Sequence, residues 1–157
     1  MHAAFSSVKK HLCIIILLFG FLTARAQVMY DNIVFRIDSF ANIGLPKSAL
    51  KEVEKLDSLA RKNNDAAQQV RAAVYRMTFQ SFLEENALDA IIGQLKKDID
   101  KANYPVKPVL QSLLAQMYWQ YYQQNRYQFS QRTRQVVPDS DFNLWDLHTI
   151  ISQTAHL

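Results

Sequence analysis

The segment from Gln116 to Phe129 restricts the fold more than any other part of the chain. It holds six aromatic residues in fourteen positions and contains no acid, cysteine, histidine or glycine. Read at the helical period, this region carries one apolar stripe: Leu110, Leu113, Leu114, Met117, Tyr118, Tyr121 and Tyr122. A second, more polar face of the same helix carries Trp119, Tyr122 and Arg126. The pattern predicts a helix that meets two neighbours, or one neighbour and a partner.

The first 26 residues have the three parts of a secretory signal peptide. Lys9-Lys10 supplies the positive charge, an apolar run of eleven residues spans Leu12 to Leu22, and Ala24-Arg25-Ala26 has the small-x-small form of a cleavage site. We expect cleavage between Ala26 and Gln27, and export to the periplasm, the cell envelope or the medium. A membrane anchor needs about 20 apolar residues, so no membrane span is expected once the leader is removed.

Removal of the leader changes the charge and the cysteine content. The whole chain has 18 basic and 14 acidic residues, and the leader holds three of the bases and none of the acids, so the remainder carries 15 against 14. A nucleic-acid partner is therefore not expected, because that function needs a concentrated basic face. The single cysteine, Cys13, lies in the leader. The mature chain is expected to have no disulfide and no thiol chemistry.

Residues 27–126 predict an all-α scaffold of about five helices. Gly44 followed by Pro46 ends one helix and begins the next, and Asp65 with Gln68 resembles a capping box. The expected ranges are 28–42, 46–62, 65–83, 86–101 and 107–126. Short turns favour antiparallel helix pairs, as in an α-solenoid, a tetratricopeptide-like array or an irregular bundle. The spacing from Gly44 to Leu56 is similar to the second helix of a tetratricopeptide repeat, but no second copy follows at the 34-residue period.

The number of apolar stripes on each predicted helix indicates whether it is buried between two neighbours or lies at the outside of the stack. The range 65–83 carries two stripes, Val70-Ala73-Val74-Met77 and Tyr75-Phe79-Phe82, as an inner helix should. The range 86–101 carries one apolar stripe, which predicts an outer helix with Asp98 and its lysine neighbours facing solvent. Glu52 is expected mostly on the solvent side of its helix.

Residues 127–141 are expected to form a loop, and residues 142–157 a last helix. Ser140 or Asp141 would cap that helix. Nothing in the sequence follows to cover both sides of the helix, so two or three of its four apolar residues are expected to be exposed: Trp145, Leu147, Ile150 and Ile151. The sequence predicts an incomplete end to the stack.

No residue pattern predicts catalysis, a metal or a cofactor. Asp146 and His148 would point about 200° apart on a helix, so with Ser152 they do not form a triad. Asp139 and Asp141 have no third ligand nearby and are better explained as a helix start. The candidate interaction residues are Trp119, Tyr122, Arg126, Tyr127, Arg132 and Trp145. Arg126 and Arg132 could bind a ligand by stacking on it. Alternatively, they could hold the 127–141 segment onto the aromatic helix that precedes it.

Several segments together resemble a known family. They are Gly44-Leu45-Pro46-Lys47-Ser48-Ala49-Leu50, the run from Pro105 to Arg126 with its Tyr118-Trp119-Gln120-Tyr121-Tyr122 core, Arg132-Thr133, and Asp141-Phe142 with Trp145-Asp146-Leu147. With the leader, they resemble the amino-terminal helical region of the alpha-2-macroglobulin-like proteins of Bacteroidetes. The resemblance spans essentially the whole mature chain.

The resemblance implies an exported, non-catalytic protein that interacts with proteases through a run of β-sandwich macroglobulin domains. This chain stops at Leu157, before any such domain, and has no mature cysteine for the Cys-Gly-Glu-Gln thioester of some relatives. Two interpretations follow. One is a truncated or split amino-terminal scaffold that docks against downstream macroglobulin domains, and the other is a free-standing tetratricopeptide-like adaptor that binds an envelope protein.

Overall fold

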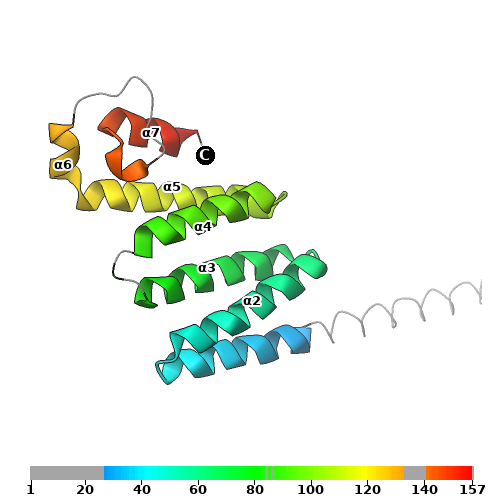
Figure 1. Ribbon diagram of the computed structural model, residues 1–157. Coiled ribbons are helices and arrows are strands. Elements are labelled where there is room, and N and C mark those ends of the chain that lie inside the picture. The colour runs from blue at the N-terminus through cyan, green and yellow to red at the C-terminus, as the bar shows by residue number, and fades with distance from the viewer. Residues whose placement is uncertain (1–26, 84, 86, 133–140, 157) are drawn as a thin grey trace, which may run out of the picture.

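A stack of helix pairs makes up the described part of the chain. The computed structural model describes residues 27–83, 85, 87–132 and 141–156, which contain no strand. Residues 27–42 are helical, and the helices that follow are α2 (Pro46–Lys62), α3 (Ala66–Leu83), α4 (Ala87–Lys101), α5 (Val106–Gln124), α6 (Arg126–Gln131), the 3₁₀ turn η1 (Phe142–Leu144) and α7 (Leu147–Ala155). Figure 1 shows the 27–42 helix at one end of the stack and α7 at the other. The prediction of an all-α fold built from antiparallel helix pairs is confirmed.

Two turns of the same geometry set the first three helices antiparallel. Before α2, the Leu45 N–H donates to Phe40 O and the Gly44 N–H to Ala41 O; before α3, the Asp65 N–H donates to Ala60 O and the Asn64 N–H to Arg61 O. This is the Schellman pattern, which needs a left-handed residue after the helix. Gly44 (φ 71°) and Asn64 (φ 51°) supply it.

The helix starts follow from local chemistry. Pro46 occupies the first turn of α2, where a missing N–H costs nothing. The Asp65 carboxylate accepts from the Gln68 N–H at 3.1 Å at the start of α3, as the capping prediction requires. Arg61 and Lys62 lie in the last turn of α2, where positive charge opposes the helix dipole.

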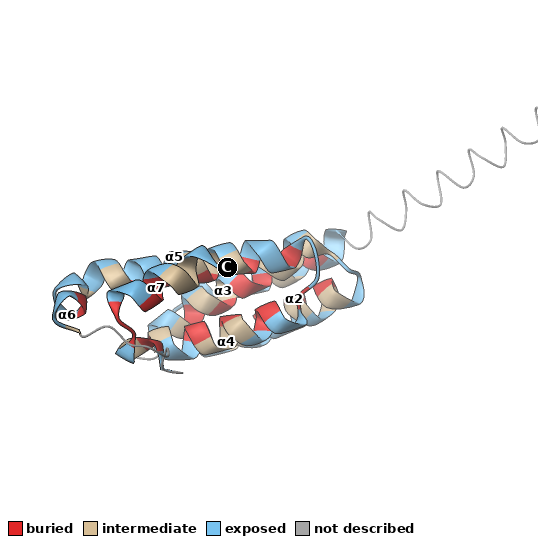
Figure 2. Ribbon diagram, turned by 90° about the horizontal axis from the view of Figure 1, so that it is seen from above, coloured by how far each residue is buried: buried red, intermediate tan, exposed pale blue. Residues whose placement is uncertain are grey.

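α3 divides the interior into two clusters. It packs against α2, α4 and α5, which confirms that it is an inner helix. Ala72 and Phe79 join the cluster formed with the 27–42 helix and α2, while Ala73 joins the larger cluster formed with α4, α5 and the C-terminal elements. Figure 2 shows the buried positions along the sides of the helices that face one another.

Several charged and apolar residues lie on the opposite side from the one predicted. Val74 and Phe82 are exposed, although their stripes were expected to be buried. Glu52 and Asp98 are buried instead of facing solvent. Both carboxylates have cationic partners on neighbouring helices, and such pairing is what permits their burial.

The C-terminal third differs from the predicted loop and single helix. Most of α6 falls in the segment expected to be a loop, and residues 133–140 of that segment lie outside the described residues. The last helix is split into η1 and α7, because Asp141 caps η1 through the Asn143 N–H and Asp146 caps α7 through the Thr149 N–H. In the part of the chain that is described, no helix is long and apolar enough to cross a membrane.

Candidate functional site

The aromatic stripe of α5 is part of the interior, as its spacing predicts. Leu110, Leu114, Met117, Tyr118 and Tyr121 are buried, and Leu113 and Tyr122 pack beside them. α5 contacts α4 and α3 on one side and α7 on the other. The helix therefore uses its aromatic half to hold the C-terminal elements.

A cluster of aromatic rings joins those elements to α5. The ring centroids of Tyr118 and Trp145 are 5.1 Å apart, as are those of Tyr121 and Phe142, and Tyr121 lies 5.7 Å from Phe129. Aromatic pairs at these distances each add about 0.5–1.5 kcal/mol beyond the area that they bury. The cluster thus fixes α6, η1 and the start of α7 against α5.

Trp145 is an interior residue and not a contact for a partner, which corrects its place among the predicted interaction residues. Its relative exposure is 4%. Its carbonyl accepts a hydrogen bond from Arg132 Nη1 at 2.6 Å, and the Arg132 guanidinium lies 4.6 Å from the centroid of the Phe129 ring. Arg132 therefore holds its own segment onto the aromatic helix, the second of the two alternatives open for the arginines.

A shallow apolar groove lies between α5 and α7. Its volume is about 220 Å³. Trp119 is 50% exposed and Ile151 is 52% exposed. The Trp119 and Tyr122 rings lie 5.3 Å apart along one side of α5. The lining residues are Tyr118, Trp119, Tyr122, Ile150, Ile151, Thr154 and Ala155.

The two walls of this groove follow from the helical spacing of residues on α5 and on α7. Trp119 and Tyr122 are three residues apart on α5, and Ile151 and Ala155 are four residues apart on α7, so each pair lies on one side of its helix. The lining contains no acid and no base. With about 220 Å³, the groove is smaller than most small-molecule sites, which measure about 300–1,000 Å³. Its chemistry suits one or two apolar side chains of another polypeptide.

The six predicted interaction residues separate into three groups. Trp119 and Tyr122 line the groove, whereas Arg126 and Tyr127 are exposed on α6 beyond its lining. Arg132 and Trp145 are engaged inside the chain. Thr154 and Ala155 were not among the predicted residues, although their helical spacing from Ile150 and Ile151 indicates the same wall of the groove.

The predicted cleavage site falls at the edge of the described residues. Ala26 lies outside them. Gln27 is exposed, and its side-chain amide donates to Asp31 at 3.0 Å.

A second hollow, of about 310 Å³, lies at the side of the stack, where α2 and α4 end and α3 and α5 begin. It is polar and includes Arg61, Lys101 and Tyr104 in its lining. Arg61 is already paired with Asp57 at 2.9 Å and lies 3.7 Å from Asp98. A guanidinium held by two carboxylates has little charge left for a ligand, so this hollow is the lesser candidate.

An ion network around the buried side chain of Arg76 links three helices, and the sequence patterns did not predict it. Arg76 of α3 donates to Glu54 at 2.9 Å and lies 3.3 Å from Asp57, both on α2, and it donates to Asp98 of α4 at 2.8 Å. Burial by itself lowers the pKa of Arg76, but the hydrogen bond to Glu54 and the charges of Asp98, Glu54 and Asp57 outweigh it, so the pKa lies above its ordinary value. The network is a permanent positive centre with three carboxylates around it, and its role is to join helices.

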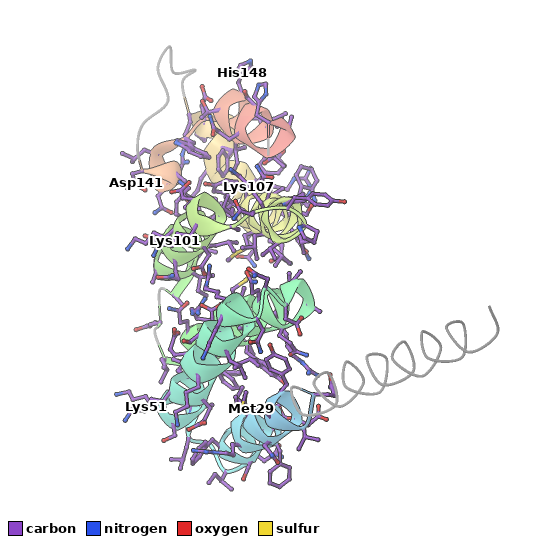
Figure 3. All side chains as sticks on the ribbon, turned by 90° about the vertical axis from the view of Figure 1, so that its right-hand side faces the viewer. Met29, Lys51, Lys101, Lys107, Asp141 and His148 are labelled. Carbon is purple, nitrogen blue, oxygen red and sulfur yellow. The ribbon has the colours of Figure 1, made fainter. Side chains whose placement is uncertain are left out.

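The acidic residues considered for a catalytic or metal site act as helix caps where they are described. Asp146 Oδ1 accepts from the Thr149 N–H at 2.6 Å and caps α7, while His148 is exposed at the outer side of α7 (Figure 3). Asp141 accepts from the Asn143 N–H at 2.9 Å; Asp139 lies outside the described residues. Among the residues that the structure describes, no group of three or more His, Cys, Asp and Glu side chains could hold a metal ion.

Comparisons with protein-family models, curated proteins and solved structures find no match to this chain.

Proposed function

We propose that this protein is an exported, non-catalytic helical scaffold that binds an apolar segment of another polypeptide in the groove between α5 and α7. The observation that carries the proposal is the exposure of Trp119 and Ile151 on the two sides of that groove. The tripartite leader supports export, and the absence of charged groups from the groove lining supports binding over chemistry.

The groove has the features of an interface centre. Tryptophan and tyrosine dominate the binding energy of many protein interfaces, and here both come from one rigid helix. Burying apolar surface contributes roughly 25 cal/mol per Å². The rim formed by Arg126 and Tyr127 on α6 is exposed, which suits the polar surroundings of such a centre.

The nature of the partner follows from the family resemblance. If the chain is the amino-terminal module of an alpha-2-macroglobulin-like protein, the segment in the groove belongs to a macroglobulin domain, and the assembly acts in protease interaction or envelope defence. The alternative is a free-standing adaptor, for which the segment belongs to another envelope protein. An adjacent reading frame that encodes macroglobulin domains would favour the first.

Site-specific photocrosslinking tests the proposal. A photoreactive residue at position 151, in the groove, should crosslink the exported protein to one polypeptide, which mass spectrometry would identify. The matched control carries the same group at Lys51, an exposed position on α2. Trp119→Ala should abolish the crosslink from position 151 while lowering the free energy of unfolding by less than about 1 kcal/mol. Equal crosslinking from both positions, or a crosslink that survives Trp119→Ala, would contradict the proposal.

A further inference from the structure

Arg132 touches the supports of both walls of the groove without lining it. Its guanidinium carbon lies 4.6 Å from the centroid of the Phe129 ring, and its Nη1 donates to the backbone carbonyl of Trp145 at 2.6 Å. A planar guanidinium can stack on a ring and donate from its edge at the same time. One side chain therefore joins α6 to the residue that precedes the cap of α7. Figure 1 shows α6, α7 and the end of α5 at the same end of the stack.

On the α5 side, a row of rings connects Phe129 to the exposed Trp119. Phe129 is buried, and its ring lies 5.5 Å from that of Tyr122 in an edge-to-face arrangement. The Tyr122 ring lies 5.3 Å from the Trp119 ring. Trp119 is half exposed, so much of its surface is not packed within the chain. Its orientation therefore depends on Tyr122, and the orientation of Tyr122 depends in turn on Phe129.

On the α7 side, the carbonyl that Arg132 binds lies at the start of the other wall. Asp146, the next residue after Trp145, is the N-cap of α7, and Ile151 follows in the second turn of that helix. A hydrogen bond from a charged donor is stronger than one between neutral groups. The bond from Arg132 therefore restricts the path of the chain into α7, and with it the position of Ile151 relative to Trp119.

From these contacts we infer that Arg132 is a positioning residue for the groove: it fixes the orientation of Trp119 and the separation of the two walls before a partner binds. The inference rests on the proposed function, because it concerns the affinity of the same groove. A side chain that becomes ordered only on binding weakens the affinity by about two- to tenfold. Loss of the guanidinium should therefore weaken binding, although Arg132 does not line the groove.

Fluorine NMR of the exported chain labelled with fluorotryptophan tests the positioning by itself. Trp119 and Trp145 are the two tryptophans of the chain, so two signals are expected, and Trp119→Phe identifies them. In Arg132→Met the Trp119 signal should narrow and move towards that of the free amino acid, because the ring reorients more freely. The Trp145 signal should remain that of a buried ring, which shows that the fold is kept. Arg71→Met, at an exposed position on α3, removes the same charge elsewhere and should leave both signals unchanged.

The crosslinking experiment then connects this positioning to binding. Arg132→Met should lower the yield of the crosslink from position 151 by about twofold or more, whereas Arg71→Met should not change it. If Arg132→Met also loses the buried Trp145 signal, Arg132→Lys replaces it. Lysine keeps the charge but has no planar group to stack on Phe129, so the Trp119 signal should narrow in the same direction.

Two results would overturn the inference: a Trp119 signal that is the same in the Arg132 variant and in the wild type, or an equal crosslink yield from the two proteins. If the Trp119 signal narrows in the variant while the wild type gives no crosslink from position 151, the proposed function fails and the positioning of Trp119 by Arg132 stands.

Discussion

Tyr118 and Trp119 are neighbours in sequence, but α5 turns their side chains to different surroundings. Tyr118 is 2% exposed and packs against Phe142 and Trp145, whereas Trp119 is half exposed in the groove. The two positions separate the contribution of an aromatic residue to stability from its contribution to binding.

Replacement of Tyr118 by alanine is expected to lower the free energy of unfolding by about 2–4 kcal/mol, because a large buried side chain is lost and a cavity remains. Trp119→Ala, one residue further on the same helix, should lower it by less than about 1 kcal/mol. Urea unfolding of both variants measures the difference. Equal losses would mean that the groove is filled within the isolated chain.

Arg76 makes a different kind of contribution, since its charge is compensated by carboxylates from two other helices. Arg76→Met removes the cation that Glu54, Asp57 and Asp98 share and leaves only Arg61 near Asp57 and Asp98, and the expected loss of stability is about 3–5 kcal/mol. Arg71→Met, at an exposed position earlier on the same helix, should change stability by no more than about 0.5 kcal/mol.

The double variant Arg76→Met/Asp98→Leu checks the physical reason. Removing both members of a buried ion pair costs less than removing one, so the double variant should regain part of the lost stability in urea melts. If Arg76→Met alone unfolds at the wild-type urea concentration, the ion network adds no net stability, because hydration of the separate charged groups would be equally favourable.

The burial of Arg76, Glu52 and Asp98 could not be predicted from the sequence. Periodicity assigns a charged residue to the outside because it has no information about a partner on another helix. Arg76 falls between Ala73 and Phe79 on the inward side of α3, a position that only the approach of α2 and α4 makes acceptable for a cation. The burial of the aromatic residues Tyr118 and Tyr121 of α5, in contrast, could be predicted from their helical spacing alone.

At the scale of the elements, two turns of the same geometry use different residues. Gly44 adopts its left-handed conformation at little cost, whereas Asn64 carries a side chain there. Gly44→Ala is expected to lower the stability by about 1–2 kcal/mol through backbone strain alone, because a methyl group at that position meets no atom within 4 Å.

Asn64→Gly is the reciprocal change and should be close to neutral, because relief of strain is offset by the greater freedom of glycine in the unfolded chain. Thermal melts of both variants would measure this asymmetry. A stability loss for Asn64→Gly as large as that for Gly44→Ala would show that the Asn64 side chain itself supports the turn.

α7 is attached less extensively than the helices in the middle of the stack. Trp145 and Ile150 are buried, while Leu147 and Ile151 are exposed, which agrees with the expectation that two or three of these four side chains would be exposed. Since α7 packs mainly on α5, we expect its amides to exchange with deuterium faster than those of α3, which has neighbours on several sides. α4 should exchange as slowly as α3. Equal protection of α7 and α3 in a monomer would show that the C-terminal end is already complete.

Helix boundaries were predictable where the sequence supplies its own stop and start residues. The predicted bounds of α2 and the predicted start of α3 agree with the structure to within one residue, because Gly44, Pro46 and Asp65 mark the turns. α6 was missed because, of its six residues, only Phe129 is buried, and one apolar residue makes no period. The groove was only partly predictable, since its walls come from helices whose contact depends on the path of the chain after α6.

For the whole molecule, export is the property with the most direct test. Mass spectrometry of envelope and secreted fractions is expected to find the protein beginning at Gln27, because the leader combines positive, apolar and small-residue regions in the order that signal peptidase recognises. A substitution of Ala26 by a large charged residue should block this processing. Recovery of peptides from the segment 1–26 attached to the exported protein would contradict the prediction.

The order in which the helices pack has a kinetic consequence. α2 packs with α3, α3 with α4 and α4 with α5, so most contacts join residues close together along the chain, and little loop-closure entropy opposes them. Folding of such a chain is expected within about microseconds to milliseconds. The cluster around Leu56 can therefore close while the residues of α5 are still being synthesised, and the molecule can assemble from its amino-terminal end, one helix at a time.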